Sequence, residues 1–123
     1  KVLAMKVLLD TNFMMLPNQM GVDIYEFLKY YEITTLFSCI EELKKISKRR
    51  SEDGKAAKIA LQLVKHNSVE IIKAGGRTDK AILDYAAAER CAVATNDKNL
   101  IKALKNKGIK IIRLRQGKYL IEE

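Results

Sequence analysis

Apolar and polar positions along the chain follow two alternating patterns. Short apolar or β-branched runs predict strands, and longer segments with apolar residues every three or four positions predict helices. The predicted strands are 7–9, 33–37, 69–72, 91–95 and 109–114, with a short additional strand at 118–121. The predicted helices are 22–31, 38–48, 52–66, 78–90 and 97–106. This order predicts an α/β fold with a mostly parallel central sheet between helices.

The chain length agrees with a single domain. The sequence has 123 residues and a mass of 14.0 kDa, and we expect residues 1–123 to form one domain. It is 48% hydrophobic and 31% charged, which argues against disorder. Its only proline and its six glycines form no linker, and no apolar run approaches the ~18 residues of a membrane span.

Cysteine usage and the first residues indicate a cytoplasmic protein. Cys39 and Cys91 are the only cysteines, too few for a disulfide framework or a zinc site. Lys6 interrupts the first apolar stretch, and no small-residue cleavage site precedes the first strand, so we expect no secretory leader. We expect the native start to be Met5 or to lie upstream of Lys1.

A strong basic charge points to a polyanionic partner. The net charge is +8 and the pI is about 9.5, which favours RNA, DNA or an acidic protein as partner. Residues 98–118 contain eight basic side chains and no acidic one, and a second basic cluster covers 44–50. The 44–50 cluster could be only a solvated helix face. The candidate contacts to a nucleic-acid backbone are Lys44, Lys45, Lys48, Arg49, Lys98, Lys102 and Lys105.

Acidic residues follow each of four predicted strands. Asp10 follows the first, Glu41 and Glu42 the second, Asp79 the third and Asp97 the fourth. Ligands of an open parallel sheet bind at the carboxyl ends of its strands, so we expect these acids to converge. Asp79 and Asp97 could alternatively serve only as helix caps. Asp10 is costly after a buried strand unless it is paired or binds metal.

The spacing after the second strand separates two neighbouring glutamates. Ser38 and Glu41 have the spacing of a capping box, in which a serine caps the helix and the glutamate reaches back to it. This interpretation gives Glu41 a structural role. Glu42 is then the acid that we expect at the site.

Converging carboxylates in a basic protein favour a divalent cation. Four neighbouring acids repel one another, and hard oxygen ligands suit Mg²⁺ or Mn²⁺. With RNA attached, such ions activate water and stabilise the leaving oxygen. We therefore expect Asp10, Glu42, Asp79 and Asp97 to be both the metal ligands and the catalytic residues of a metal-dependent nuclease.

Four short motifs, in order, resemble those of PIN-domain nucleases. They are Leu8-Leu9-Asp10-Thr11-Asn12, Glu42-Leu43, Asp79 within Thr78-Asp79-Lys80-Ala81, and Ala94-Thr95-Asn96-Asp97. The resemblance spans nearly the whole chain, from Val7 to Leu114. It implies a three-layer α/β/α sandwich and an Mg²⁺- or Mn²⁺-dependent endoribonuclease, with the four acids as ligands. It further implies that Thr11, Asn12, Thr95 and Asn96 support the carboxylates.

Two branches of this family fit the chain. VapC-type toxins are small PIN proteins, usually dimeric and inhibited by an antitoxin peptide. Ribosome-processing PIN proteins cleave pre-rRNA and imply a ribosome-assembly partner. The opening segment 10–17 is more similar to the processing branch, while the length fits either.

Two further interpretations stay open at this point. A non-catalytic PIN-fold module that binds RNA or protein has the same basic surface, and loss of metal binding would mark it. A homodimer edge is also expected in the apolar segment after the first strand. Its members are Phe13, Met14, Met15, Leu16 and Met20.

Overall fold

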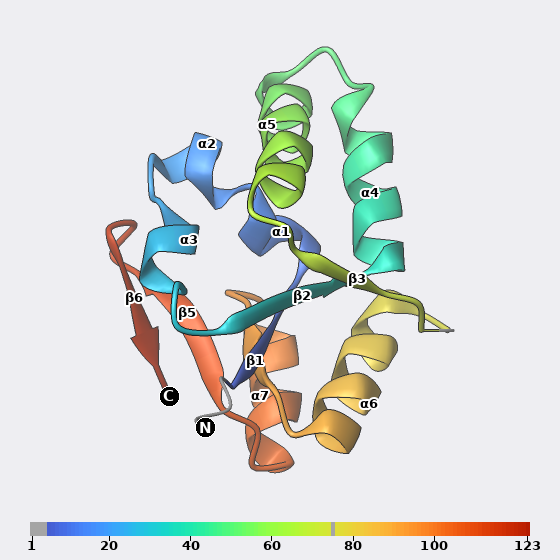
Figure 1. The fold of residues 1–123 in the computed structure, drawn as a ribbon, viewed down its shortest axis with the longest axis vertical. Helices are drawn as coiled ribbons and strands as arrows, with labels where there is room; N and C mark the ends of the chain where they lie inside the picture. Colours follow the sequence, from blue (N-terminus) through green and yellow to red (C-terminus); the bar gives the residue numbers. More distant parts are fainter. Residues whose placement is uncertain (1–4, 75) are drawn as a thin grey trace.

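A six-stranded sheet forms the centre of the molecule in the computed structural model, which describes residues 5–74 and 76–123. The strand order is β3-β2-β1-β4-β5-β6, and only β6 runs antiparallel to its neighbour (Figure 1). The strands are β1 (Lys6–Leu9), β2 (Glu32–Leu36), β3 (Glu70–Ile72), β4 (Ala92–Ala94), β5 (Ile111–Arg115) and β6 (Tyr119–Glu122). The mostly parallel sheet is confirmed, together with the additional strand near the end of the chain.

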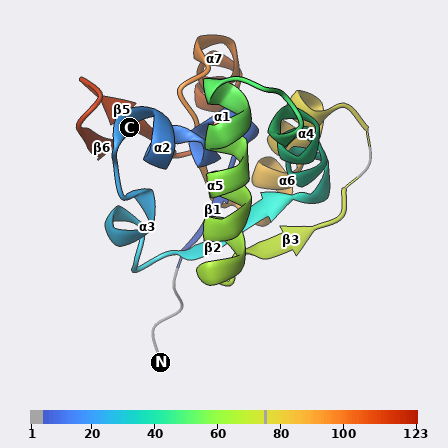
Figure 2. The same cartoon turned by 90° about the horizontal axis from the view of Figure 1, so that it is seen from above.

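Helices cover both faces of this sheet. Helices α1 to α5 lie on one face, and α6 and α7 lie on the other (Figures 1 and 2). Right-handed crossovers produce this arrangement, because the chain first moves outward from β1 to β3 and then returns to β4 and β5. The helices are α1 (Thr11–Met14), α2 (Leu16–Met20), α3 (Ile24–Phe27), α4 (Phe37–Ser47), α5 (Glu52–His66), α6 (Thr78–Glu89) and α7 (Lys98–Asn106). The α/β/α sandwich is therefore confirmed.

The two central strands are buried on both faces. The Val7–Leu9 side chains of β1 and the Ala92–Ala94 side chains of β4 are all 0% exposed. Strands enclosed by helices on both sides read as continuous apolar runs, which is why the sequence shows no alternation here. Cys39 and Cys91 are buried and unpaired, as expected of small apolar side chains. Among the described residues, none of the helices is both long and apolar enough to cross a bilayer.

A tight connection joins α4 to α5. The Ser51 hydroxyl accepts a hydrogen bond from the Gly54 N–H at 3.3 Å and caps α5. A Cβ atom at Gly54 would collide with the backbone carbonyl oxygen of Arg49. Glycine therefore lets the two helices form a close hairpin above the carboxyl ends of the strands.

The helix predicted over 22–31 is much shorter in the structure. Helix α2 ends at Gly21, whose φ of +65° lies in the left-handed region that favours glycine. Asp23 then caps α3, which ends at Phe27 after four residues. The apolar stripe of this segment is incomplete, because Phe27 and Tyr30 are 51% and 81% exposed. Without a continuous buried face, a longer helix has little to stabilise it.

The apolar segment after β1 belongs to the core. Phe13, Met14, Met15 and Leu16 are at most 8% exposed, because α1 packs under α4 and α5. These four side chains cannot form the predicted dimer edge. Of that group only Met20 reaches the surface, with 54% of its area exposed.

Candidate active site

Asp10 is held in place by three parts of the chain. It directly follows β1 and caps α1, and its Oδ1 accepts a hydrogen bond from the Phe13 N–H at 2.7 Å. The Thr95 hydroxyl, just beyond β4, donates to Oδ2 of the same carboxylate. Since β1 pairs with β4 in register up to Leu9 and Ala94, the acid and the threonine leave the sheet side by side. Asp10 is only 8% exposed, which fixes its orientation.

Burial makes the Asp10 carboxylate unusually basic. Desolvation raises its pKa from 3.8 to about 6, although the hydrogen bonds from Thr95 and Phe13 oppose this shift. The charges of Asp97 and Asp79 raise the pKa further. Those two acids therefore lie close enough to repel Asp10. A buried acid surrounded by like charges is typical of a functional site rather than of a structural one.

Asp97 shares the Thr95 hydroxyl with Asp10. The Asp97 N–H donates to Thr95 Oγ1 at 3.1 Å, while its carboxylate caps α7 by accepting the N–H groups of Asn99 and Leu100. Both acids line one cleft of about 230 Å³. The other residues lining it are Asn12, Phe13, Leu16, Gln19 and Asn96. Gln19 is a polar group that the sequence pattern did not point to, because α2 carries no motif around it.

Glu42, and not its neighbour, contacts the turn that holds Asp10. The Thr11 hydroxyl donates to Glu42 Oε1 at 3.2 Å, which links α4 to the turn after β1. Glu41 instead lies 3.9 Å from Lys44 on the exposed side of α4. The capping box that led to this choice is wrong: α4 begins at Phe37, the extended Leu36 precedes it, and Ser38 makes no capping bond. The chain passes straight from β2 into the helix, so Ser38 lies inside the first turn.

Asp79 approaches the site from the other face of the sheet. It lies in the first turn of α6 and is exposed to solvent. Asp84, further along the same helix, pairs with Lys80 at 2.8 Å and is exposed to solvent. Of the two acids, only Asp79 raises the pKa of Asp10.

The acids share one edge of the sheet without forming a closed cage. Within residues 5–74 and 76–123, no group of three or more histidine, cysteine or acidic side chains is placed to hold one ion. The donors at this edge are all oxygens, which fits Mg²⁺ or Mn²⁺. Mg²⁺ is commonly held by one or two carboxylates while it keeps several waters. The donor set therefore fits such an ion, and the assignment of the four acids as ligands stays a prediction.

The predicted supporting residues divide into two kinds. Thr11 and Thr95 each donate to an acid of the site. Asn96 binds the backbone of Leu114 through both ends of its amide, at 3.1 and 2.8 Å, and so ties the loop after β4 to β5. Asn12 is exposed and lines the cleft.

Two acids from the last strand partly neutralise the C-terminal basic run. Glu123 pairs with Lys105 and Arg113, both at 2.6 Å, and Glu122 lies 3.4 Å from Lys110. These acids follow the basic run in the sequence, and the antiparallel turn into β6 folds them back onto it. The run of 98–118 is therefore less positive than its composition suggests.

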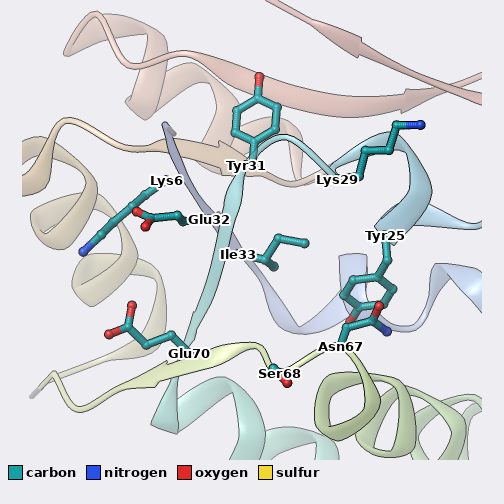
Figure 3. A pocket seen from close by; sticks show the side chains of 9 residues that line it. All are labelled: Lys6, Tyr25, Lys29, Tyr31, Glu32, Ile33, Asn67, Ser68 and Glu70. Atoms are coloured by element: carbon teal, nitrogen blue, oxygen red, sulfur yellow. The ribbon is translucent and has the colours of Figure 1, made fainter. Parts of the chain in front are cut away.

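A cavity larger than the cleft at Asp10 lies at the opposite edge of the sheet. It has a volume of about 620 Å³ and opens at the amino ends of β1, β2 and β3. Figure 3 shows Lys6, Glu32 and Glu70 on one side, with Tyr25 and Asn67 on the other. It contains none of the predicted site residues, and its charges are of both signs.

Comparison with known proteins agrees with this geometry. The PIN like domain family matches residues 7–117, and the chain belongs to that family. It is 33% identical to ribonuclease VapC4 of Methanocaldococcus jannaschii over 123 residues, covering 93% of each chain. It is also 27% identical to ribonuclease VapC9 of Archaeoglobus fulgidus, covering 93% of this chain and 86% of that protein.

A solved structure supports the fold alone. A domain of a functionally unknown protein from Methanocaldococcus jannaschii superimposes with a TM-score of 0.65 at 16% identity, over 91% of this chain and 92% of the other. Both curated relatives carry the toxin-branch name VapC, whereas the opening motif favoured the processing branch.

Proposed function

We propose that this protein is a metal-dependent endoribonuclease that hydrolyses RNA phosphodiester bonds. The observation that supports this most is Asp10: a buried carboxylate at the carboxyl edge of the sheet, oriented by Thr95 and Phe13 and repelled by Asp97 and Asp79. Such a group is costly unless a cation or a proton joins it. The names of the two curated relatives, both ribonucleases, agree with the proposal.

The four acids have distinct tasks in this proposal. Asp10 and Asp97 hold Mg²⁺ or Mn²⁺ at the cleft, and Glu42 and Asp79 complete the set from α4 and α6. When bound, the ion supplies charge stabilisation of the phosphodiester and a more acidic water. Thr95 and Thr11 keep the carboxylates of Asp10 and Glu42 in fixed orientations.

Basic side chains bring RNA to this otherwise repulsive edge. In the C-terminal run, Lys105 is already paired with Glu123, whereas Lys98 and Lys102 carry no ion pair among the described residues. Among the described residues, Lys45 on α4 and Lys48 directly after that helix likewise have no acidic partner within 4.0 Å. We therefore assign the backbone contacts first to Lys45, Lys48, Arg49, Lys98 and Lys102, and only secondarily to Lys44 and Lys105.

A toxin role in the cytoplasm is the finer proposal. The names of the relatives favour the VapC-type branch over rRNA processing, and that branch implies an antitoxin peptide as partner. A homodimer remains part of this proposal through surfaces other than the buried Phe13–Leu16 segment. Co-expression with the neighbouring reading frame, followed by purification of a complex, tests the antitoxin partner.

The decisive experiment is cleavage of a mixed structured RNA with Mn²⁺ or with EDTA, run beside Asp10→Asn. We expect cleavage only with the metal and only with Asp10. Asp23→Asn is a matched control, because Asp23 is also an N-cap acid whose side chain accepts one backbone N–H, on α3 away from the site.

Two results would contradict the proposal. If Asp10→Asn cleaves RNA at the wild-type rate, Asp10 is not part of the catalytic site. RNA binding without cleavage in any metal would instead support the non-catalytic RNA-binding module.

A further inference from the structure

An exposed aromatic side chain lies at the same carboxyl edge of the sheet as the acids. Leu9 pairs with Thr35, and Leu36 pairs with Ile72, so Phe37 leaves the sheet between the turn that follows β1 and Lys73. Neighbouring strands are about 4.8 Å apart, which places Phe37 one strand from the turn that holds Asp10.

The Phe37 ring is poorly packed for its size. It is 41% exposed, and Ile71, which pairs with Thr35 two positions before it, is 45% exposed. Lys73 Nζ lies 5.9 Å from the ring centroid, the geometry of a cation–π contact. An apolar ring with a cation over it, beside an acidic edge, combines the two features that hold an unpaired nucleotide: a stacking surface and a partner for phosphate.

We propose that Phe37 stacks on an unpaired base of the RNA next to the scissile phosphodiester, with Lys73 moving to the adjacent phosphate. This inference rests on the proposed function and adds to it a residue that contacts a base of the substrate. Bases inside a duplex already stack on their neighbours and cannot reach the ring. Lys73 leaves Phe37 at little cost, because an exposed cation–π contact is weak.

The sequence and the fold give Phe37 no competing structural task. It is the first residue of α4, where the Ile40 and Leu43 side chains provide the buried face. Removing a side chain this exposed leaves the core intact. A change in RNA binding would therefore report on the ring itself.

The test is the binding of a short single-stranded RNA in EDTA, where no cleavage occurs, measured by fluorescence anisotropy. We expect Phe37→Ala to weaken binding about 5- to 100-fold, the range for loss of one base–aromatic stack. Phe37→Trp is expected to restore affinity, and Phe37→Leu, which is apolar without a π face, is not. A 2-aminopurine placed in the RNA is quenched on binding to wild type and remains bright with Phe37→Ala.

A matched pair elsewhere on the surface serves as control. Lys29 Nζ lies 5.4 Å from the Tyr30 ring, and both residues are exposed near the amino edge of the sheet. Tyr30→Ala removes the same kind of exposed cation–aromatic contact and is expected to leave RNA binding unchanged.

The outcomes separate this inference from the proposed nuclease. Wild-type affinity of Phe37→Ala or of Phe37→Leu overturns stacking. Stacking without cleavage in any metal supports the base contact at Phe37, but contradicts the proposed nuclease and the placement of that base beside a scissile bond. A wild-type protein that binds no RNA overturns both.

Discussion

The two edges of the same sheet differ in what they do with charge. The amino edge has the larger cavity, about 620 Å³ against about 230 Å³, but its charged residues are of both signs and none of them is buried. At the carboxyl edge Asp10 is buried, the negative charges of Asp97 and Asp79 lie near it, and the Thr95 hydroxyl donates a hydrogen bond to it. The folded protein holds the Asp10 carboxylate near other negative charges, and this repulsion favours the binding of a cation or a proton. The volume of a cavity creates no such requirement. Site chemistry here follows the buried charge rather than the volume.

The largest effect is expected from neutralising one acid at each of the two edges and comparing the rates of RNA cleavage. Glu42→Gln removes a carboxylate linked to Thr11, and we expect RNA cleavage to fall about 1000-fold, since the charge stabilisation at such sites amounts to several kcal/mol. Glu70→Gln, at the amino edge, should leave the rate within about twofold. Glu41→Gln is the control on the same helix. If Glu42→Gln and Glu70→Gln lower the rate of RNA cleavage equally, catalysis is not confined to the carboxyl edge.

The pH dependence of stability should distinguish Asp10 from exposed acids. Folding raises the pKa of Asp10 to about 6, so its contribution to stability is fully present below the unfolded value of 3.8 and is lost as the pH rises through 6. In EDTA, the free energy of unfolding of wild type should fall relative to Asp10→Asn by about 3 kcal/mol between about pH 3.5 and about pH 7.

Urea denaturation across this range measures the difference. Asp84→Asn, an exposed acid paired with Lys80, should show the wild-type slope. A parallel pH dependence of wild type and Asp10→Asn would mean that Asp10 titrates as an ordinary carboxyl group.

Two buried threonines allow a finer comparison. Thr95 donates to Asp10, and Thr34, equally buried on β2, donates to the backbone carbonyl of Val7 at 3.2 Å. Thr95→Val should lower cleavage about 10- to 100-fold, the usual effect of removing a partner that orients a metal ligand. Thr34→Val should cost about 1 kcal/mol of stability and leave the rate unchanged.

The hydroxyl itself can be tested separately. Thr95→Ser keeps the donor and should recover most of the activity. An equally inactive Thr95→Ser would assign the effect to packing and not to the hydrogen bond.

The smallest effect concerns the salt dependence of RNA binding. Lys45 has no acidic partner among the described residues, and Lys45→Ala should reduce the slope of log affinity against log salt by about 0.7 for single-stranded RNA. Lys105→Ala should change it less, because Glu123 already neutralises this cation. Binding titrations at several salt concentrations measure both slopes. A larger change for Lys105 would place the RNA along α7 instead of α4.

Local patterns predicted most of the fold. Helix α5 begins and ends at the predicted residues because a capping serine and a regular apolar stripe agree there. The helix prediction for 22–31 was wrong for the opposite reason. Its aromatic residues follow a helical period, but Gly21 and the exposed Phe27 leave no continuous face to bury. Of the two glutamates, Glu42 accepts the hydrogen bond from Thr11, although the capping box used to choose it does not form, and its role at the site stays a prediction.

The sequence by itself determined where the strands lie and that an acid follows four of them, because short apolar runs and the residues that end them are local properties of the chain. Only the tertiary structure decided which groups meet. Thr11 and Glu42 are 31 positions apart, and Asp10 and Thr95 are 85 apart. The antiparallel return of β6 likewise places Glu123 on Lys105 and Arg113. Burial, and with it the raised pKa of Asp10, exists only once both sheet faces are covered, since desolvation depends on every element packed around the carboxylate.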